Sequence, residues 1–157
     1  MFPFDYRYQL EGKKRPDPLP ELIAHHRRKI AEVRETHEGP IVLVGKSMGG
    51  RVGCHVSLEE PIDALVCFGY PLQAAGSGKL RDEVLLQLQT PVLFVQGTRD
   101  PLCPLTLLDP LLPRMTARNA LYLVEGGDHS LQVSKRGPQD SVDRGILDAV
   151  KGFLEKR

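Results

Sequence analysis

The chain has 157 residues, 41% of them hydrophobic and 26% charged, a composition typical of a globular domain rather than a disordered segment. Its net charge of +1 gives no general attraction to nucleic acid or to an anionic membrane surface, so neither is expected as a partner. No apolar run approaches the ~20 residues that cross a bilayer, and the length suits a single domain over residues 1–157.

Helical and strand-like segments alternate along the chain. A first helix is expected in "PDPLPELIAHHRRKIAEVRETHEG" (16–39), with Asp17 as its N-cap. The wholly apolar run "IVLVG" (41–45) is typical of a strand buried on both faces. Further strands are expected at 62–71, 91–97 and 119–127, and further helical stretches at 48–60, 79–89, 104–115 and 140–157. This alternation predicts an α/β fold with a mostly parallel sheet and helices on both faces.

The three cysteines, Cys54, Cys67 and Cys103, show no CxxC spacing and cannot all pair with one another. Cys54 lies in a predicted helix and Cys67 in a predicted strand. Buried free thiols are therefore expected, which favours a reducing cytoplasm as the compartment.

Gly45, Ser47 and Gly49 match the pattern G-x-S-x-G between a predicted strand and a predicted helix. Such a turn, called a nucleophile elbow, is sharp and strained, and it lifts the serine hydroxyl clear of the sheet. Glycines are expected on both sides of the serine because neighbouring backbone passes close. The backbone N–H of Met48 is then expected to face a developing oxyanion. The alternative interpretation of Ser47 is an ordinary tight-turn or helix-capping serine.

A serine hydroxyl needs a base to accept its proton, and in this arrangement the partners follow in the order Ser, Asp/Glu, His. Asp100 and His129 each come directly after a later predicted strand. Carboxyl ends of parallel strands meet at one edge of a sheet, so Ser47, Asp100 and His129 are the expected nucleophile, acid and base. Asp128 and Asp109 compete for the role of acid. Asp128 adjoins His129, where a hydrogen bond to the imidazole is awkward, and Asp109 lies in a helical stretch.

Four residues just beyond the same strand ends are candidates to line an acyl pocket: Tyr70, Leu72, Leu102 and Cys103. No set of His, Cys, Asp and Glu residues has metal-ligand spacing, so no metal is expected. Triad chemistry needs no cofactor, so none is expected either. The expected partner is a small-molecule acyl substrate.

Three stretches carry a family resemblance: "GKSMGGR" (45–51), the segment from "YPLQ" to "DPLC" (70–103), and "GGDHSL" (126–131). With them the chain resembles the α/β-hydrolase superfamily, and more narrowly its dienelactone-hydrolase-like branch. That branch includes bacterial predicted hydrolases, the testis-expressed hydrolase-like protein and the hydrolase domain of a histone-acetyltransferase-complex subunit. The resemblance implies a hydrolase with Ser47, Asp100 and His129 as nucleophile, acid and base. Dienelactone hydrolases themselves use a cysteine nucleophile, so their substrate is not carried over.

In that superfamily several strands precede the elbow strand, and a loop among them supplies a second oxyanion N–H. Nothing before Ile41 has a strand pattern, and "MFPFDYRY" is similar to the segment that follows those strands in this branch. We therefore expect an N-terminally truncated fold that lacks the second donor and exposes the strand at 41–45 as a sheet edge, open to self-association. The alternative to a serine hydrolase is a non-enzymatic hydrolase-like interaction module, since one relative is a chromatin-complex subunit.

Overall fold

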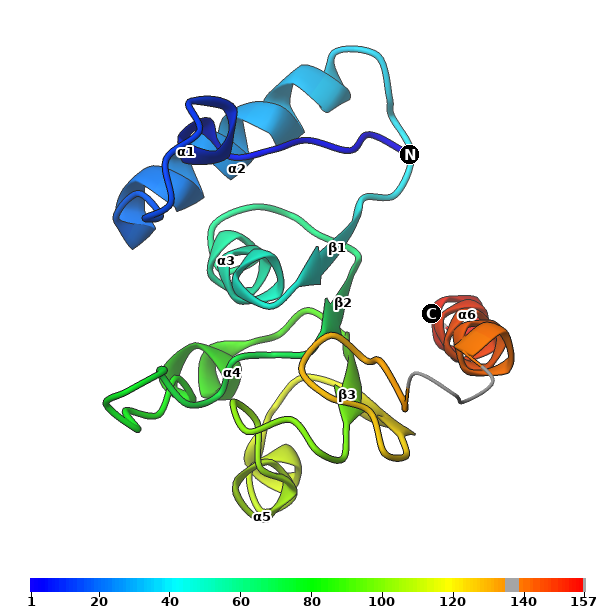
Figure 1. Cartoon of the computed structure of the whole chain (residues 1–157). Helices are drawn as coiled ribbons and strands as arrows, with labels where there is room; N and C mark the ends of the chain where they lie inside the picture. Colours follow the sequence, from blue (N-terminus) through cyan, green and yellow to red (C-terminus); the bar gives the residue numbers. More distant parts are fainter. Residues whose placement is uncertain (135–138, 157) are drawn as a thin grey trace.

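Four parallel strands form one sheet in the computed structural model, which describes residues 1–134 and 139–156 (Figure 1). The strands are β1 (Val42–Lys46), β2 (Ala64–Phe68), β3 (Val92–Gly97) and β4 (Asn119–Val124), and they lie side by side in chain order. Each neighbouring pair is parallel, so all four strands end at the same edge of the sheet. The predicted α/β fold with a parallel sheet is confirmed.

Helices cover both faces of this sheet, as predicted (Figure 1). On one side lie α3 (Met48–Val56), α4 (Glu83–Gln87) and α5 (Leu105–Leu108), and on the other lies α6 (Gln139–Glu155). Strand residues alternate between the two layers because successive side chains point to opposite faces. Leu65 and Cys67 belong to the cluster on the α3 side, whereas Ala64 and Val66 pack in the cluster on the α6 side.

The N-terminal segment forms a further layer, in which α2 (Leu19–Arg34) packs on α3 and α1 (Arg7–Leu10) lies beside it (Figure 1). Pro18, not the predicted Asp17, is the N-cap of α2. The proline ring fixes φ, here −54°, and the ψ of 146° leaves Pro18 outside the helix, while its carbonyl accepts hydrogen bonds from the N–H groups of Glu21 and Leu22.

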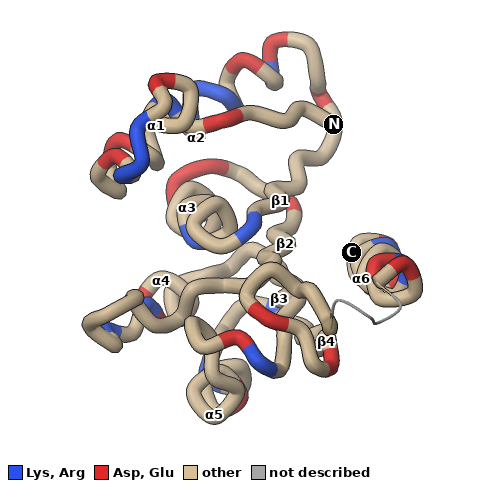
Figure 2. Tube along the Cα trace, in the orientation of Figure 1, with Lys and Arg blue, Asp and Glu red and all other residues tan. Residues whose placement is uncertain are grey.

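Charges of both signs are interspersed along the chain (Figure 2). The basic residues of α2 are partly engaged: the Arg27 guanidinium donates to Glu59 and to Glu60 just beyond α3, at 2.7 Å each. These ion pairs hold the outer layer against α3 at an exposed position, where each contributes little to stability.

The prediction that the run 41–45 is buried on both faces is wrong. Val44 is 60% exposed and Lys46 is exposed, while the central strands β2 and β3 are almost wholly buried. The reason is position: β1 pairs with β2 on one side, and no strand of the described residues pairs with it on the other. We call this side, over Val42–Lys46, the free edge of β1.

Several elements are shorter than their sequence patterns predict. The helical stretch at 104–115 consists of α5 and a short 3-10 turn at Leu112–Arg114, because Pro110 and Pro113 have no N–H to donate to a continuous helix. Strand β2 ends at Phe68, where Gly69 turns the chain with φ +59°. No helix within 1–134 or 139–156 is long and apolar enough to cross a membrane.

Candidate active site

Ser47 occupies a strained turn between β1 and α3. Its φ is +50°, in the left-handed region that side chains normally avoid, and such a residue costs about 1–3 kcal/mol that the surrounding structure must offset. The Ser47 N–H donates to the Phe68 carbonyl at 2.8 Å, so β2 holds the turn in place. The elbow geometry expected from G-x-S-x-G is therefore present.

The two glycines of the G-x-S-x-G motif differ in how closely other backbone approaches them. A Cβ on Gly45 would lie 2.3 Å from the carbonyl carbon of Gly49 and 2.3 Å from the nitrogen of Gly50. A Cβ on Gly50 would lie 3.0 Å from the Gly45 oxygen. A Cβ on Gly49, by contrast, would meet no described atom within 4 Å. The expectation of close backbone contact is confirmed for Gly45 and is wrong for Gly49.

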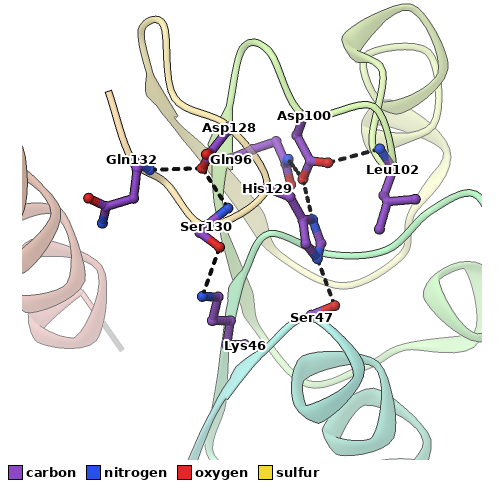
Figure 3. Close-up of polar contacts among 9 residues, drawn as sticks. All are labelled: Lys46, Ser47, Gln96, Asp100, Leu102, Asp128, His129, Ser130 and Gln132. Carbon is purple, nitrogen blue, oxygen red and sulfur yellow. Dashed lines mark hydrogen bonds and ion pairs between the residues drawn. The ribbon is translucent and has the colours of Figure 1, made fainter. Parts of the chain in front are cut away.

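The structure brings Ser47, Asp100 and His129 together from the ends of β1, β3 and β4 (Figure 3). His129 Nε2 lies 2.8 Å from Ser47 Oγ, and His129 Nδ1 lies 2.8 Å from Asp100 Oδ2. A carboxylate only accepts hydrogen bonds, so this contact places the imidazole proton on Nδ1. Nε2 is then left with its lone pair directed at the serine hydroxyl.

Asp100 is held by two further donors. Its side chain is fully buried, the Leu102 N–H donates to Oδ1 at 2.8 Å, and the Gln96 amide donates to Oδ2 at 2.7 Å (Figure 3). Donors of this kind stabilise a carboxylate that is out of contact with water. Gln96 was not among the predicted site residues, although one polar residue in the apolar strand "VLFVQG" was a usable signal.

Neither competing acid contacts the imidazole. Asp128 Oδ1 accepts the backbone N–H groups of Ser130, at 2.8 Å, and Gln132, at 3.0 Å. Asp109 ends α5 and is exposed. The geometry therefore places Asp100 on His129, in agreement with the choice made from chain order.

Two glycines make room for the segment that carries His129. A Cβ on Gly69 would lie 2.7 Å from the His129 carbonyl oxygen, and a Cβ on Gly97 would lie 2.3 Å from that of Gly127. Gly69 follows β2 and Gly97 ends β3, so the loop after β4 crosses the carboxyl ends of both strands. These positions were also missed, because a close approach between distant segments leaves no local sequence pattern.

The remaining predicted site residues lie near the same strand ends. Met48 is the first residue of α3, so its N–H has no acceptor within the helix; its role toward an oxyanion stays a prediction. Tyr70, Leu72 and Cys103 belong to the buried core in this structure, whereas Leu102 is partly exposed. Lining of an acyl pocket by these four residues also stays a prediction.

The cysteines are buried free thiols, as expected. Cys54 Sγ lies 3.8 Å from Cys67 Sγ, and this contact together with burial raises the pKa of the Cys54 thiol. Burial raises the pKa of Cys103 to about 12, with the nearby Asp100 charge adding to it. Such thiols remain protonated and unreactive at neutral pH. No group of three or more His, Cys, Asp or Glu side chains in the described part of the chain is arranged to hold a metal ion.

Residues 1–153 match a protein family described as an alpha/beta hydrolase domain, and the chain belongs to that family. Among solved structures, it is similar to an alpha-beta serine hydrolase homologue from Coxiella burnetii (TM-score 0.66, 16% identity, covering 87% of this chain and 62% of the other). It is also similar to the serine hydrolase CarC, involved in carbazole degradation (TM-score 0.64, 19% identity, covering 92% of this chain and 75% of the other). A third similar structure is that of a protein from Klebsiella pneumoniae provisionally named a dienelactone hydrolase (TM-score 0.62, 18% identity, covering 96% of this chain and 68% of the other). At these identities the likeness concerns the fold, and this chain spans less than two thirds of the Coxiella protein. The superfamily resemblance is confirmed, and the fold supports hydrolase activity in general.

Proposed function

We propose that the chain is a serine hydrolase of ester or related small-molecule acyl substrates, with Ser47 as nucleophile, His129 as base and Asp100 as the acid that orients the base. The observation that carries this proposal is the continuous line of contacts from Ser47 Oγ through both imidazole nitrogens to Asp100 Oδ2, at 2.8 Å each. An interaction module has no physical need for this alignment of three polar groups on a strained turn.

The proposed reaction has two steps. Ser47 Oγ attacks the acyl carbon while Nε2 of His129 takes the hydroxyl proton, and Asp100 stabilises the imidazolium that forms. The tetrahedral intermediate collapses to an acyl-enzyme as His129 protonates the leaving group. Water then attacks the acyl carbon while His129 takes its proton, and the carboxylic acid product leaves as His129 returns the proton to Ser47 Oγ. The Met48 N–H is the proposed oxyanion donor, at the start of α3.

A fluorophosphonate probe tests the proposal without knowledge of the substrate, because it labels a serine that is activated by a base. We expect the wild-type chain to be labelled and Ser47→Ala to be unlabelled, with a matching loss of turnover on a short-chain aryl ester. Ser57→Ala is the matched control, since Ser57 caps the other end of α3, and it should label as wild type does.

An unlabelled wild-type chain with an intact fold would contradict the proposal. That outcome would favour the hydrolase-like interaction module, for which the free edge of β1 offers an unpaired strand. A reducing, cytoplasmic location is part of the proposal and suits the three free thiols.

A further inference from the structure

His129 lies in a tight turn, residues Asp128–Gln132, which we call the His129 turn. Four hydrogen bonds close it, and all of them involve Asp128. The carboxylate accepts the N–H groups of Ser130 and Gln132 through Oδ1, at 2.8 and 3.0 Å. The Asp128 backbone N–H donates to the Gln132 carbonyl at 3.0 Å, and the Asp128 carbonyl accepts from the Leu131 N–H at 2.9 Å.

The turn holds a strained residue. Leu131 has φ +61°, and it shares this unfavourable region with only one other non-glycine residue of the described chain, Ser47. Leu131 is also buried, in the cluster that packs against α6. A branched side chain stays in this conformation only where the surrounding contacts over-determine it. The two N–H groups that Asp128 Oδ1 accepts flank Leu131 on either side, at positions 130 and 132.

A second contact ties the His129 turn to the elbow strand. Lys46 Nζ donates to Ser130 Oγ at 3.2 Å (Figure 3). Lys46 directly precedes Ser47, and Ser130 directly follows His129. The contact therefore runs beside the Ser47–His129 hydrogen bond and joins the same two segments, although its exposure to water makes it weak.

We propose that Asp128 is a positioning residue for His129: it closes the strained turn that sets the imidazole between Ser47 and Asp100, and Lys46 assists through Ser130. This inference rests on the proposed function, since it assigns a task to Asp128 within that site. The task requires a hydrogen-bond acceptor at Oδ1 and no negative charge. Asparagine provides the same acceptor and is equally favoured in turns of this kind, whereas alanine provides none.

The decisive comparison is between Asp128→Ala and Asp128→Asn. Asp128 is exposed, so neither substitution leaves a void in the core, and both variants are expected to fold. We expect Asp128→Ala to lower kcat on an aryl ester at least about tenfold, because displacement of a reacting group by a fraction of an ångström has effects of this size. KM should stay within about twofold, since uniform substrate binding is untouched. The rate of fluorophosphonate labelling should fall in parallel with kcat.

Asp128→Asn should restore labelling and kcat to within about threefold of wild type, because its amide oxygen accepts the same two N–H groups. Asp109→Ala, which removes an exposed aspartate outside the site, is the control and should match wild type. A wild-type labelling rate in Asp128→Ala, or an Asp128→Asn variant as slow as Asp128→Ala, would overturn the proposal. Failure of the wild type to label would instead count against the proposed function.

If Asp128→Ala does not fold, Lys46→Met carries the test, because Lys46 is exposed and outside the core. Lys46→Met should slow labelling a few-fold, about the effect of one weak contact, and Lys46→Arg should restore it. Equal labelling by Lys46→Met and wild type would then overturn the proposal.

Discussion

Replacing Asp100 with asparagine should give a stable protein that is almost inactive. The new amide would keep an oxygen toward the Leu102 N–H and place its NH2 group where Oδ2 now lies. There the NH2 group faces Nδ1 of His129 and the Gln96 side chain. Gln96 Oε1 has no hydrogen-bond partner in the described structure. A half-turn of the Gln96 amide would let Oε1 accept one of the new N–H groups, while the other donates to Nδ1.

This arrangement pairs both new N–H groups, but it moves the Gln96 NH2 group to the position where Oε1 had no partner, and it fixes the wrong tautomer. With Nδ1 accepting, the imidazole proton sits on Nε2, which can no longer take a proton from Ser47. We expect kcat to fall about 10⁴-fold, the loss that this tautomer change causes in serine proteases, which corresponds to about 5.5 kcal/mol of transition-state stabilisation. The free energy of unfolding should fall by about 1–3 kcal/mol, because the Gln96 NH2 group loses its acceptor while the Leu102 N–H keeps its own.

Asp100→Ala provides the contrast. It leaves the buried Leu102 N–H and the Gln96 amide without their acceptor, at about 1–3 kcal/mol each. Initial rates on an aryl ester and urea unfolding curves for both variants measure the two effects separately. The reasoning is refuted if Asp100→Asn keeps kcat within tenfold of wild type, or if it loses as much stability as Asp100→Ala.

Three further predictions concern the elbow, the outer layer and the sheet edge. Gly45→Ala should destabilise the fold strongly and abolish labelling, because the new Cβ would lie 2.3 Å from backbone atoms of Gly49 and Gly50, whereas Gly49→Ala should fold and label normally; thermal melts of this pair decide it. Burial lowers the pKa of His26 to about 4, so the unfolded chain binds more protons between pH 6.5 and 4. The free energy of unfolding should therefore fall by up to about 3 kcal/mol as the pH drops through that window. His26→Phe should flatten this part of the pH dependence in urea titrations, and an unchanged slope would contradict it. The wild-type chain should associate through the free edge of β1 as its concentration rises, and Val44→Lys should reduce association in sedimentation velocity; a wild type that stays monomeric would contradict this.

The local features of this protein could be predicted from its amino-acid sequence. Alternating apolar runs and helical patterns are enough to define an α/β sheet, because the periods of strands and helices are properties of a few consecutive residues. The elbow is likewise local: Gly45 must be glycine because it touches Gly49 and Gly50, four and five residues away. The choice of Asp100 over Asp128 also came from the sequence, through the order of strand ends along the chain.

Features that depend on which strands are neighbours could be established from the folded structure but not from local sequence patterns. The apolar run at 41–45 alone predicts a strand buried on both faces, whereas the resemblance to a longer fold predicts an exposed edge, and the strand order agrees with the edge. The close approach of Gly69 to His129 and of Gly97 to Gly127 needs the loop after β4 to cross the ends of β2 and β3. Such contacts join residues through folded geometry, which no spacing along the chain records.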